Sequence, residues 1–153
     1  MTRVESNTDM DAPANTIWNV LMEPSYLPKL YPYIVTEEAI PPGRAAVGQK
    51  LILFGRVGAV RVKITIQLAA VQAESRLVSR NVPGALFATF EHTVTLSPDG
   101  FRTQVKSVFE YSLSSEYLQK VPDAAMLELK VNEGLQAYAR NLKEISELLP
   151  LPS

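Results

Sequence analysis

His92 is the only histidine in a chain of 153 residues that has no cysteine, so any acid–base chemistry starts from it. An imidazole with its ordinary pKa near ~6.5 exchanges a proton at neutral pH, which suits a general base or a hydrogen-bond donor to a ligand carbonyl. It alternates with Phe90 and Val94 in a strand-like run. A core histidine bonded to a backbone or hydroxyl group is the alternative, and both interpretations stay open.

The sequence gives little support for a metal site or a nucleophilic triad. One histidine without inward carboxylates cannot supply the usual three or four metal ligands, so we expect no metal site. Ser107 is expected as a diagonal neighbour of His92, roughly ~7 Å away at the backbone, and no inward carboxylate would orient the imidazole. The absence of cysteine removes thiolate nucleophiles and disulfides. We expect no cofactor.

Arg80 is the second candidate, and its role depends on which face of its strand is inward. If Val78, Arg80 and Val82 face inward, the guanidinium enters a cavity and can hold a carboxylate or stabilise an enolate. If Leu77, Ser79 and Asn81 face inward, Arg80 is solvated, as arginines usually are. Periodicity does not decide, although the general exposure of arginines favours the outer placement. The tyrosines Tyr111 and Tyr138 can each donate a phenolic hydrogen bond, but aromatic residues at these spacings are more typical of a core.

Two hairpins would position these residues. With a turn at Val57-Gly58, the strands 48–57 and 59–68 place Leu53 opposite Val62 and leave Arg61 and Lys63 outside. A turn at residues 97–100 pairs Leu96 with Phe101 and His92 with Val105. That second register predicts an inward face made of Phe90, His92, Val94, Val105, Ser107, Phe109, Tyr111 and Leu113, with Glu91 opposite Lys106 on the outside.

A long amphipathic helix is predicted from about Pro122 to Leu149. Its apolar stripe consists of Leu127, Val131, Leu135, Tyr138, Leu142, Ile145 and Leu149. Gly134 lies on this stripe, where glycine costs about 0.8 to 1 kcal/mol against alanine. It either allows a close approach of helix and sheet or leaves room for a ligand.

The segment Met10–Ile34 reads MDAPANTIWNVLMEPSYLPKLYPYI. Asp11 is predicted to cap a first short helix with Pro13 in its first turn, and a second short helix is expected from about Ser25 to Leu30. A loop is expected at Ile40–Gly48, which contains two prolines and two glycines.

The pattern of Ala12-Pro13, Trp18 with Leu21, then Pro28 and Pro32 resembles the entry segment of the polyketide cyclase/dehydrase and lipid-transport superfamily. This helix-grip fold is shared with StAR-related lipid-transfer domains, birch pollen allergen relatives and abscisic acid receptors. Arg76-Leu77-Val78, Pro83-Gly84, His92 and the turn before Thr103 resemble the later half of its bacterial cyclase-like members. The turn at residues 82–86 resembles, in position, the loop that gates the cavity of abscisic acid receptors.

The resemblance implies an α+β fold in one domain, residues 1–153. It comprises a curved antiparallel sheet of about seven strands wrapped around the long C-terminal helix, with two short helices after the first strand. In such proteins the ligand cavity lies between the sheet and the last helix.

Composition excludes several partners. The net charge is −1 and the cationic residues are scattered singly, so we expect no positively charged stripe that could bind nucleic acid. No segment is apolar enough to span a membrane, and the polar start MTRVESNTDMD favours the cytoplasm. Ile52 and Phe54 are expected outside, where Arg61 and Lys63 cover them or they seed contact between copies. We therefore expect a monomer or a weak homodimer.

These observations predict a protein that binds a hydrophobic or aromatic small molecule, as a carrier or binding protein. A cofactor-free cyclase or dehydratase with His92 as base is the alternative, and a module whose outer face binds a protein is a weaker third. Small residues at Gly55 and Ala88 predict a pocket open to solvent near Pro42 and Gly84. The candidate ligand-binding residues are Leu53, Val62, Ile64, Arg80, Phe90, His92, Ser107, Phe109, Tyr111, Val131, Gly134, Leu135 and Tyr138.

Overall fold

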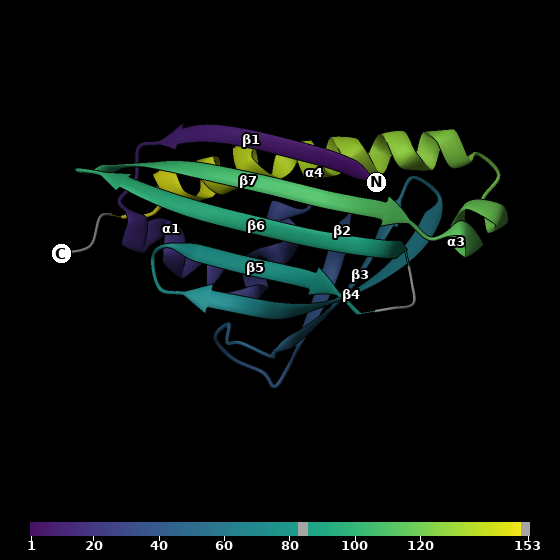
Figure 1. The fold of residues 1–153 in the computed structure, drawn as a ribbon, viewed down its shortest axis with the longest axis horizontal. Coiled ribbons are helices and arrows are strands. Elements are labelled where there is room, and N and C mark those ends of the chain that lie inside the picture. Colours follow the sequence, from purple (N-terminus) through teal and green to yellow (C-terminus); the bar gives the residue numbers. More distant parts are fainter. Residues whose placement is uncertain (83–85, 151–153) are drawn as a thin grey trace.

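A strongly curved antiparallel sheet dominates the computed structural model, which describes residues 1–82 and 86–150 (Figure 1). In these residues the sheet has seven strands in the order β1-β7-β6-β5-β4-β3-β2. The elements follow the chain as β1 (Thr2–Met10), α1 (Ala14–Leu21), η1 (Pro24–Tyr26), α2 (Leu27–Leu30), β2 (Ile34–Ile40), β3 (Lys50–Val57), β4 (Val60–Gln72), β5 (Arg76–Asn81), β6 (Phe87–Asp99), β7 (Arg102–Leu113), α3 (Ser115–Lys120) and α4 (Ala124–Leu148).

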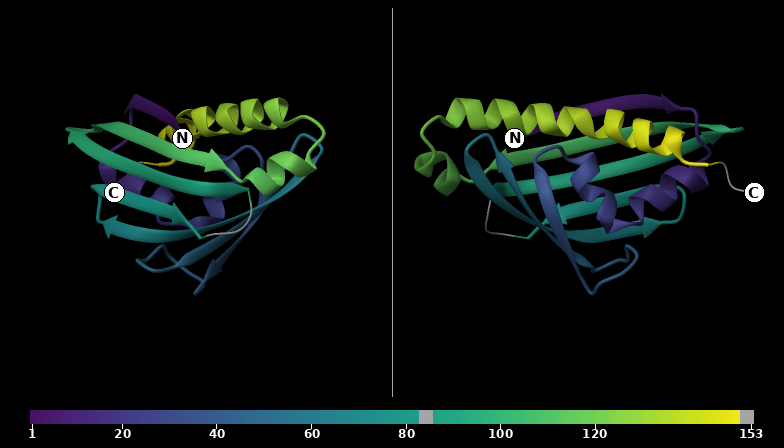
Figure 2. Two further views of the ribbon diagram at one scale, coloured as in Figure 1. Left: turned by 45° about the vertical axis from the view of Figure 1, so that its right-hand side comes forward. Right: turned by 180° about the vertical axis from the view of Figure 1, so that it is seen from behind.

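The helix α4 and the short helices after β1 lie on the same side of the sheet (Figure 2). The sheet curves around them, and the hydrophobic core fills the space between. This is the predicted helix-grip α+β fold. The loop expected after Ile40 is also present, since β2 ends there and β3 begins at Lys50.

The long helix buries its predicted stripe. Asp123 caps α4 by accepting a hydrogen bond from the backbone N–H of Met126 at 3.0 Å. Leu127, Val131, Leu135, Tyr138 and Leu142 are all buried, and Ile145 and Leu149 pack partly against the core. An amphipathic helix of this length gains its stability mainly from such packing.

Both hairpins place the expected residues inside but pair them differently. The turn between β3 and β4 is Gly58-Ala59, so Leu53 pairs with Ile64 instead of Val62, a shift of two residues. Between β6 and β7 the turn is Gly100-Phe101, and His92 pairs with Phe109 instead of Val105, a shift of four. Each turn begins with a glycine at positive φ, 62° for Gly58 and 65° for Gly100, which two-residue hairpin turns favour.

The register shift also changes one expected outer pair. Glu91 lies opposite Glu110, and Lys106 lies opposite Thr95. The predicted Glu91–Lys106 pair was therefore wrong. An even shift leaves every side chain on its own face, which is why the inward set survived.

Asp11 does not cap the first helix. Pro13 occupies the N-cap position of α1, and no side chain caps the helix there. The Asp11 backbone N–H instead donates to the Glu147 carboxylate at 2.8 Å, and the Asp11 carboxylate pairs with Arg102 at 2.7 Å. These contacts tie the end of β1 to the end of α4 and to the start of β7.

The outer face of β3 carries the expected apolar residue. Phe54 is 43% exposed, and the Lys63 ammonium lies 5.8 Å from the centre of its ring. This agrees with a cationic stem covering an aromatic surface. Association between copies stays a prediction. None of the helices in the described part of the chain is long and apolar enough to cross a membrane.

Candidate functional site

A narrow cleft enters the interior between the short helices and the sheet. We call it the histidine cleft; its cavity measures about 30 Å³. Exposed Glu23 and the half-buried Leu27 and Ala45 mark its outer end, and His92 and Tyr138 are buried. It is lined by Val20, Leu21, Glu23, Pro24, Leu27, Leu30, Tyr31, Ala45, Leu51, Ile66, Leu68, Leu77, Ser79, His92 and Tyr138.

His92 is held by two hydroxyl groups and two aromatic rings. Its Nε2 pairs with the Ser107 hydroxyl at 2.8 Å, and its Nδ1 pairs with the Tyr31 hydroxyl at 3.4 Å. The ring stacks on Phe109 with centroids 3.7 Å apart and meets Tyr138 edge-on at 4.6 Å. Either neutral tautomer fits, because both hydroxyl groups can donate or accept.

Burial fixes the protonation state of this network. Removal from water lowers the pKa of His92 to about 3, so the imidazole is neutral at physiological pH. Burial likewise raises the pKa of Tyr31 and of Tyr138 well above the ordinary value. The cleft therefore offers neutral hydrogen-bonding groups among apolar and aromatic side chains.

The Ser107 hydroxyl reaches the imidazole although the two residues are not paired across the hairpin. Ser107 pairs with Val94 across the hairpin, so it remains a diagonal neighbour of His92. Diagonal neighbours are within reach of long side chains, and the imidazole spans the gap to the hydroxyl. A serine–histidine pair therefore exists. Among the described residues no carboxylate bonds the imidazole, whose other nitrogen faces Tyr31.

Arg80 points away from the interior, which corrects its inclusion among the cavity residues. Its side chain is 59% exposed, and its Nε lies 2.9 Å from the Glu91 carboxylate. Leu77 and Ser79 face inward instead and line the histidine cleft, which is the second of the two placements considered for this strand. Ser79, opposite His92 in the sheet, joins the site.

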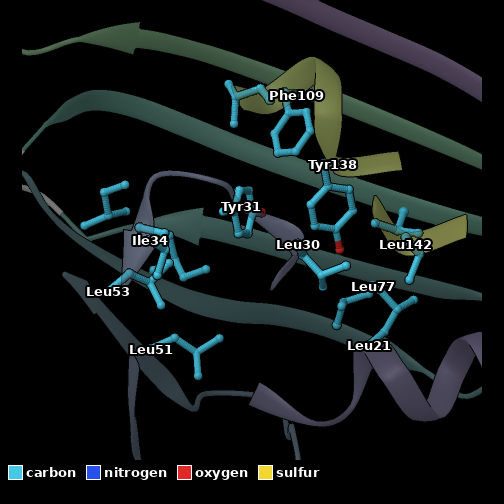
Figure 3. Packing of buried hydrophobic residues seen from close by; sticks show 14 of the residues in the cluster. Leu21, Leu30, Tyr31, Ile34, Leu51, Leu53, Leu77, Phe109, Tyr138 and Leu142 are labelled. Carbon is cyan, nitrogen blue, oxygen red and sulfur yellow. The ribbon is translucent and has the colours of Figure 1, made fainter. Parts of the chain in front are cut away.

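Tyr31 and Tyr33, which are not among the candidate residues, divide the interior. Tyr31 lines both the histidine cleft and a second cavity of about 10 Å³, and Tyr33 lines that second cavity. Figure 3 shows Tyr31 beside Tyr138, whose hydroxyl points toward Leu30 and Leu77. The alternation of Tyr31-Pro32-Tyr33 before a strand was the available signal, since Pro32 is exposed between two buried rings.

The remaining candidates occupy different places. Leu53, Ile64 and Phe90 line the second cavity. Val62, Val131 and Leu135 are core residues, and the Tyr111 hydroxyl accepts a hydrogen bond from the Asn132 amide at 3.1 Å. A Cβ added to Gly134 would lie 2.6 Å from two ring carbons of Tyr33, so this glycine serves close packing of α4 against that ring.

The expected solvent-open pocket is absent from the described residues. Aromatic rings fill the interior, leaving the cavities of about 30 and 10 Å³. The hollow near Pro42 is a surface depression that Glu23, Glu37 and Glu38 line. Ala88 is exposed, and Gly84 lies outside the described residues, as do the central residues 83–85 of the turn that resembles a gating loop in position. The described part of the chain has no cluster of residues able to hold a metal ion.

The family model for polyketide cyclase/dehydrase and lipid transport matches residues 1–147. The chain belongs to this family. No curated protein sequence matches it.

Solved structures share the fold of this family member. An aromatase/cyclase from Streptomyces sp. R1128 is 20% identical, with 95% of this chain and 93% of that chain covered and a TM-score of 0.76. A START superfamily protein from Mycobacterium smegmatis is 18% identical, covered over 97% and 99%, with a TM-score of 0.75. Norcoclaurine synthase from Thalictrum flavum is 20% identical, covered over 97% and 87%, with a TM-score of 0.67. At these identities the likeness concerns the fold alone.

Proposed function

We propose that this protein binds an apolar or aromatic small molecule in the histidine cleft, as a carrier or binding protein for compounds such as quinones, lipids or secondary metabolites. The observation that carries the proposal is the buried, uncharged Tyr31–His92–Ser107 network at the inner end of an apolar cleft. Apolar walls with a few convergent polar groups are typical of small-molecule sites. The family match supports the same function.

Binding requires the cleft to widen. The cavity of about 30 Å³ holds a water molecule or two, whereas ligand pockets typically measure about 300 to 1,000 Å³. The outer end is closed by few polar contacts: the Ala45 N–H donates to the Met22 carbonyl at 2.8 Å, and Arg44 donates to Asn19 at 2.9 Å. We propose that the ligand selects a conformation in which the loop 41–49 moves away from α1.

The Tyr138 hydroxyl is the best single probe of this binding. It has no hydrogen-bond partner among the described residues, and Tyr138 lines the cleft beside His92. A ligand hydroxyl or carbonyl that reaches it gains one neutral hydrogen bond, worth about 1 kcal/mol or about fivefold in affinity.

The test compares 2-naphthol with naphthalene by calorimetry and thermal shift. We expect both compounds to raise the unfolding midpoint, and Tyr138→Phe to weaken 2-naphthol binding about fivefold while naphthalene binding stays unchanged. Tyr117→Phe is the matched control, because Tyr117 lies on α3 and lines none of the histidine cleft. Failure of both compounds to bind wild type contradicts the proposal.

A second candidate is a cofactor-free cyclase or dehydratase of polyketide-like substrates with His92 as general base. The pairing of a neutral imidazole with a serine hydroxyl favours it. However, a base whose pKa is about 3 has a weak affinity for protons, which favours binding over catalysis. Wild-type acceleration of cyclisation that falls about 10² to 10⁴-fold in His92→Gln would establish the enzyme.

A further inference from the structure

A further hollow opens on the surface between α4, residues 32–33 and the end of β3. We call it the cationic groove; it measures about 330 Å³. Figure 2 (right) shows the end of the β3–β4 hairpin beside the first half of α4, where this groove lies. Its lining is Pro32, Tyr33, Arg56, Val57, Gly58, Lys130, Glu133, Gly134, Ala137 and Arg140. Buried Tyr33, Gly134 and Ala137 give it an apolar floor.

The charges around this floor are unbalanced. Arg56, Lys130 and Arg140 face one carboxylate, Glu133, and none of the four forms an ion pair with a described residue. Arg56 also lies directly opposite Arg61 across the hairpin. Like charges in that relation are destabilising, and a bound anion relieves the repulsion. Cations around a concave, apolar floor concentrate positive potential there.

Tyr33 is the wall between this groove and the interior. It lines the groove on one side and the cavity of about 10 Å³ on the other. Its backbone is fixed, because its carbonyl accepts from the Arg56 N–H at 2.9 Å and packs on Gly55. Its hydroxyl has no hydrogen-bond partner within residues 1–82 and 86–150, and within these residues the ring is held by packing, as against Gly134. A side-chain rotation would therefore join groove and interior without breaking a hydrogen bond to any described residue.

We propose that the cationic groove binds the anionic head of an amphipathic small molecule whose apolar body enters the interior past the Tyr33 ring. The ligand class is an apolar acid, with a carboxylate or an equivalent monoanion at one end. Arg56 and Lys130 would make charge-assisted hydrogen bonds to the head, and burial of the body would provide most of the affinity. This inference rests on the proposed function and specifies the chemical class of its ligand.

The test uses three probes with the same ten-carbon chain, each below its micelle concentration: decanoate, 1-decanol and decyltrimethylammonium. By calorimetry we expect decanoate to bind wild type at least about tenfold more tightly than decanol, and the cation most weakly. The preference should fall with added salt, because the groove is open to solvent. Acetate, the head alone, should not compete.

The decisive variant is the double substitution Arg56→Gln and Lys130→Gln. We expect it to reduce decanoate affinity to the level of decanol and to leave decanol affinity unchanged. The matched control is Lys50→Gln with Arg76→Gln, since both cations are exposed and line neither the histidine cleft nor the cationic groove. This control should keep the preference for decanoate.

The outcomes separate the two proposals. Equal affinity of wild type for decanoate and decanol overturns the role of the groove and leaves apolar binding intact. A preference for decanoate that survives in the groove variant, or that the control variant also loses, overturns it too. If neither decanoate, decanol nor 2-naphthol binds, the proposed function fails and this inference fails with it.

Discussion

The histidine cleft and the cationic groove approach the same interior from different sides, and they present polar groups in opposite ways. In the cleft, His92, Ser107 and Tyr31 are buried, uncharged and bonded to one another. In the groove, Arg56 and Lys130 are charged and exposed. Two tyrosines on one short segment, Tyr31 and Tyr33, separate these hollows.

The contrast follows from the cost of removing charge from water. An isolated buried charge is so unfavourable that the group loses it, as His92 does through its lowered pKa. A cation at the mouth of an open groove keeps its hydration and still attracts an anion over several ångströms. The inner end is thus suited to orienting a neutral group, and the groove is suited to selecting a charged one.

The strongest test of the inner end removes the ring beneath the imidazole. Phe109 is fully buried and stacks on His92, so Phe109→Ala should destabilise the fold by about 3 to 5 kcal/mol through lost burial and a new cavity. Urea unfolding measures the change. Phe101→Ala is the matched control: Phe101 is 85% exposed at the hairpin tip, and its loss should cost no more than about 0.5 kcal/mol. Comparable losses in the two variants would contradict this packing.

The second test uses pH and concerns the inner end of the histidine cleft. His92 has a pKa of about 3 in the folded protein against 6.5 unfolded. Below pH 6.5 the imidazole therefore binds a proton in the unfolded chain but stays neutral in the folded chain. The free energy of unfolding falls as the pH falls. The expected loss is about 2 kcal/mol between roughly pH 8 and pH 5, read from urea unfolding at each pH.

The pH dependence between pH 8 and pH 5 can be assigned to His92 because the chain has a single histidine. In His92→Gln the slope between pH 8 and pH 5 should largely disappear. An NMR titration of wild type should show the imidazole still neutral at pH 5. A His92 that titrates near its ordinary pKa would mean that water reaches the inner end, and the contrast with the groove would be lost.

The faces of the strands could be predicted from the sequence, but their pairings could not. Alternation assigns His92, Ser107 and Phe109 to one face whatever the partner, and a shift of two or four residues preserves that assignment. The pairing depends on the turn, and the glycines at 58 and 100 take the positive-φ positions that set the register. Arg80 shows what alternation cannot decide. Alternation alone allowed two orientations of this strand, and the pairing of Ser79 with His92 in the sheet distinguishes them.

The extent of the cavity could not be predicted from the sequence. A helix stripe and a sheet face are predictable one at a time, whereas the space between them depends on which rings meet there. Tyr31 packs against Tyr138 with centroids 5.0 Å apart, a contact between residues distant in the chain. The cationic groove was missed for the same reason: its cations come singly from a strand and a helix and gather only in the fold.

The smallest expected effect tests whether the Tyr33 ring is a movable wall. In Gly134→Ala the new methyl would lie 2.6 Å from ring carbons of Tyr33, so the ring must shift. Overpacking lowers the free energy of unfolding by about 1 to 3 kcal/mol, whereas the higher helix propensity of alanine raises it by about 1 kcal/mol. Because the ring can shift without breaking a hydrogen bond to any described residue, we expect a net loss of about 1 kcal/mol by urea unfolding. In a Tyr33→Ala background the clash is gone, and Gly134→Ala should stabilise the fold by up to about 1 kcal/mol. This change of sign measures the coupling between helix and ring. Equal effects of Gly134→Ala in the two backgrounds would show that Tyr33 does not form the wall between groove and interior.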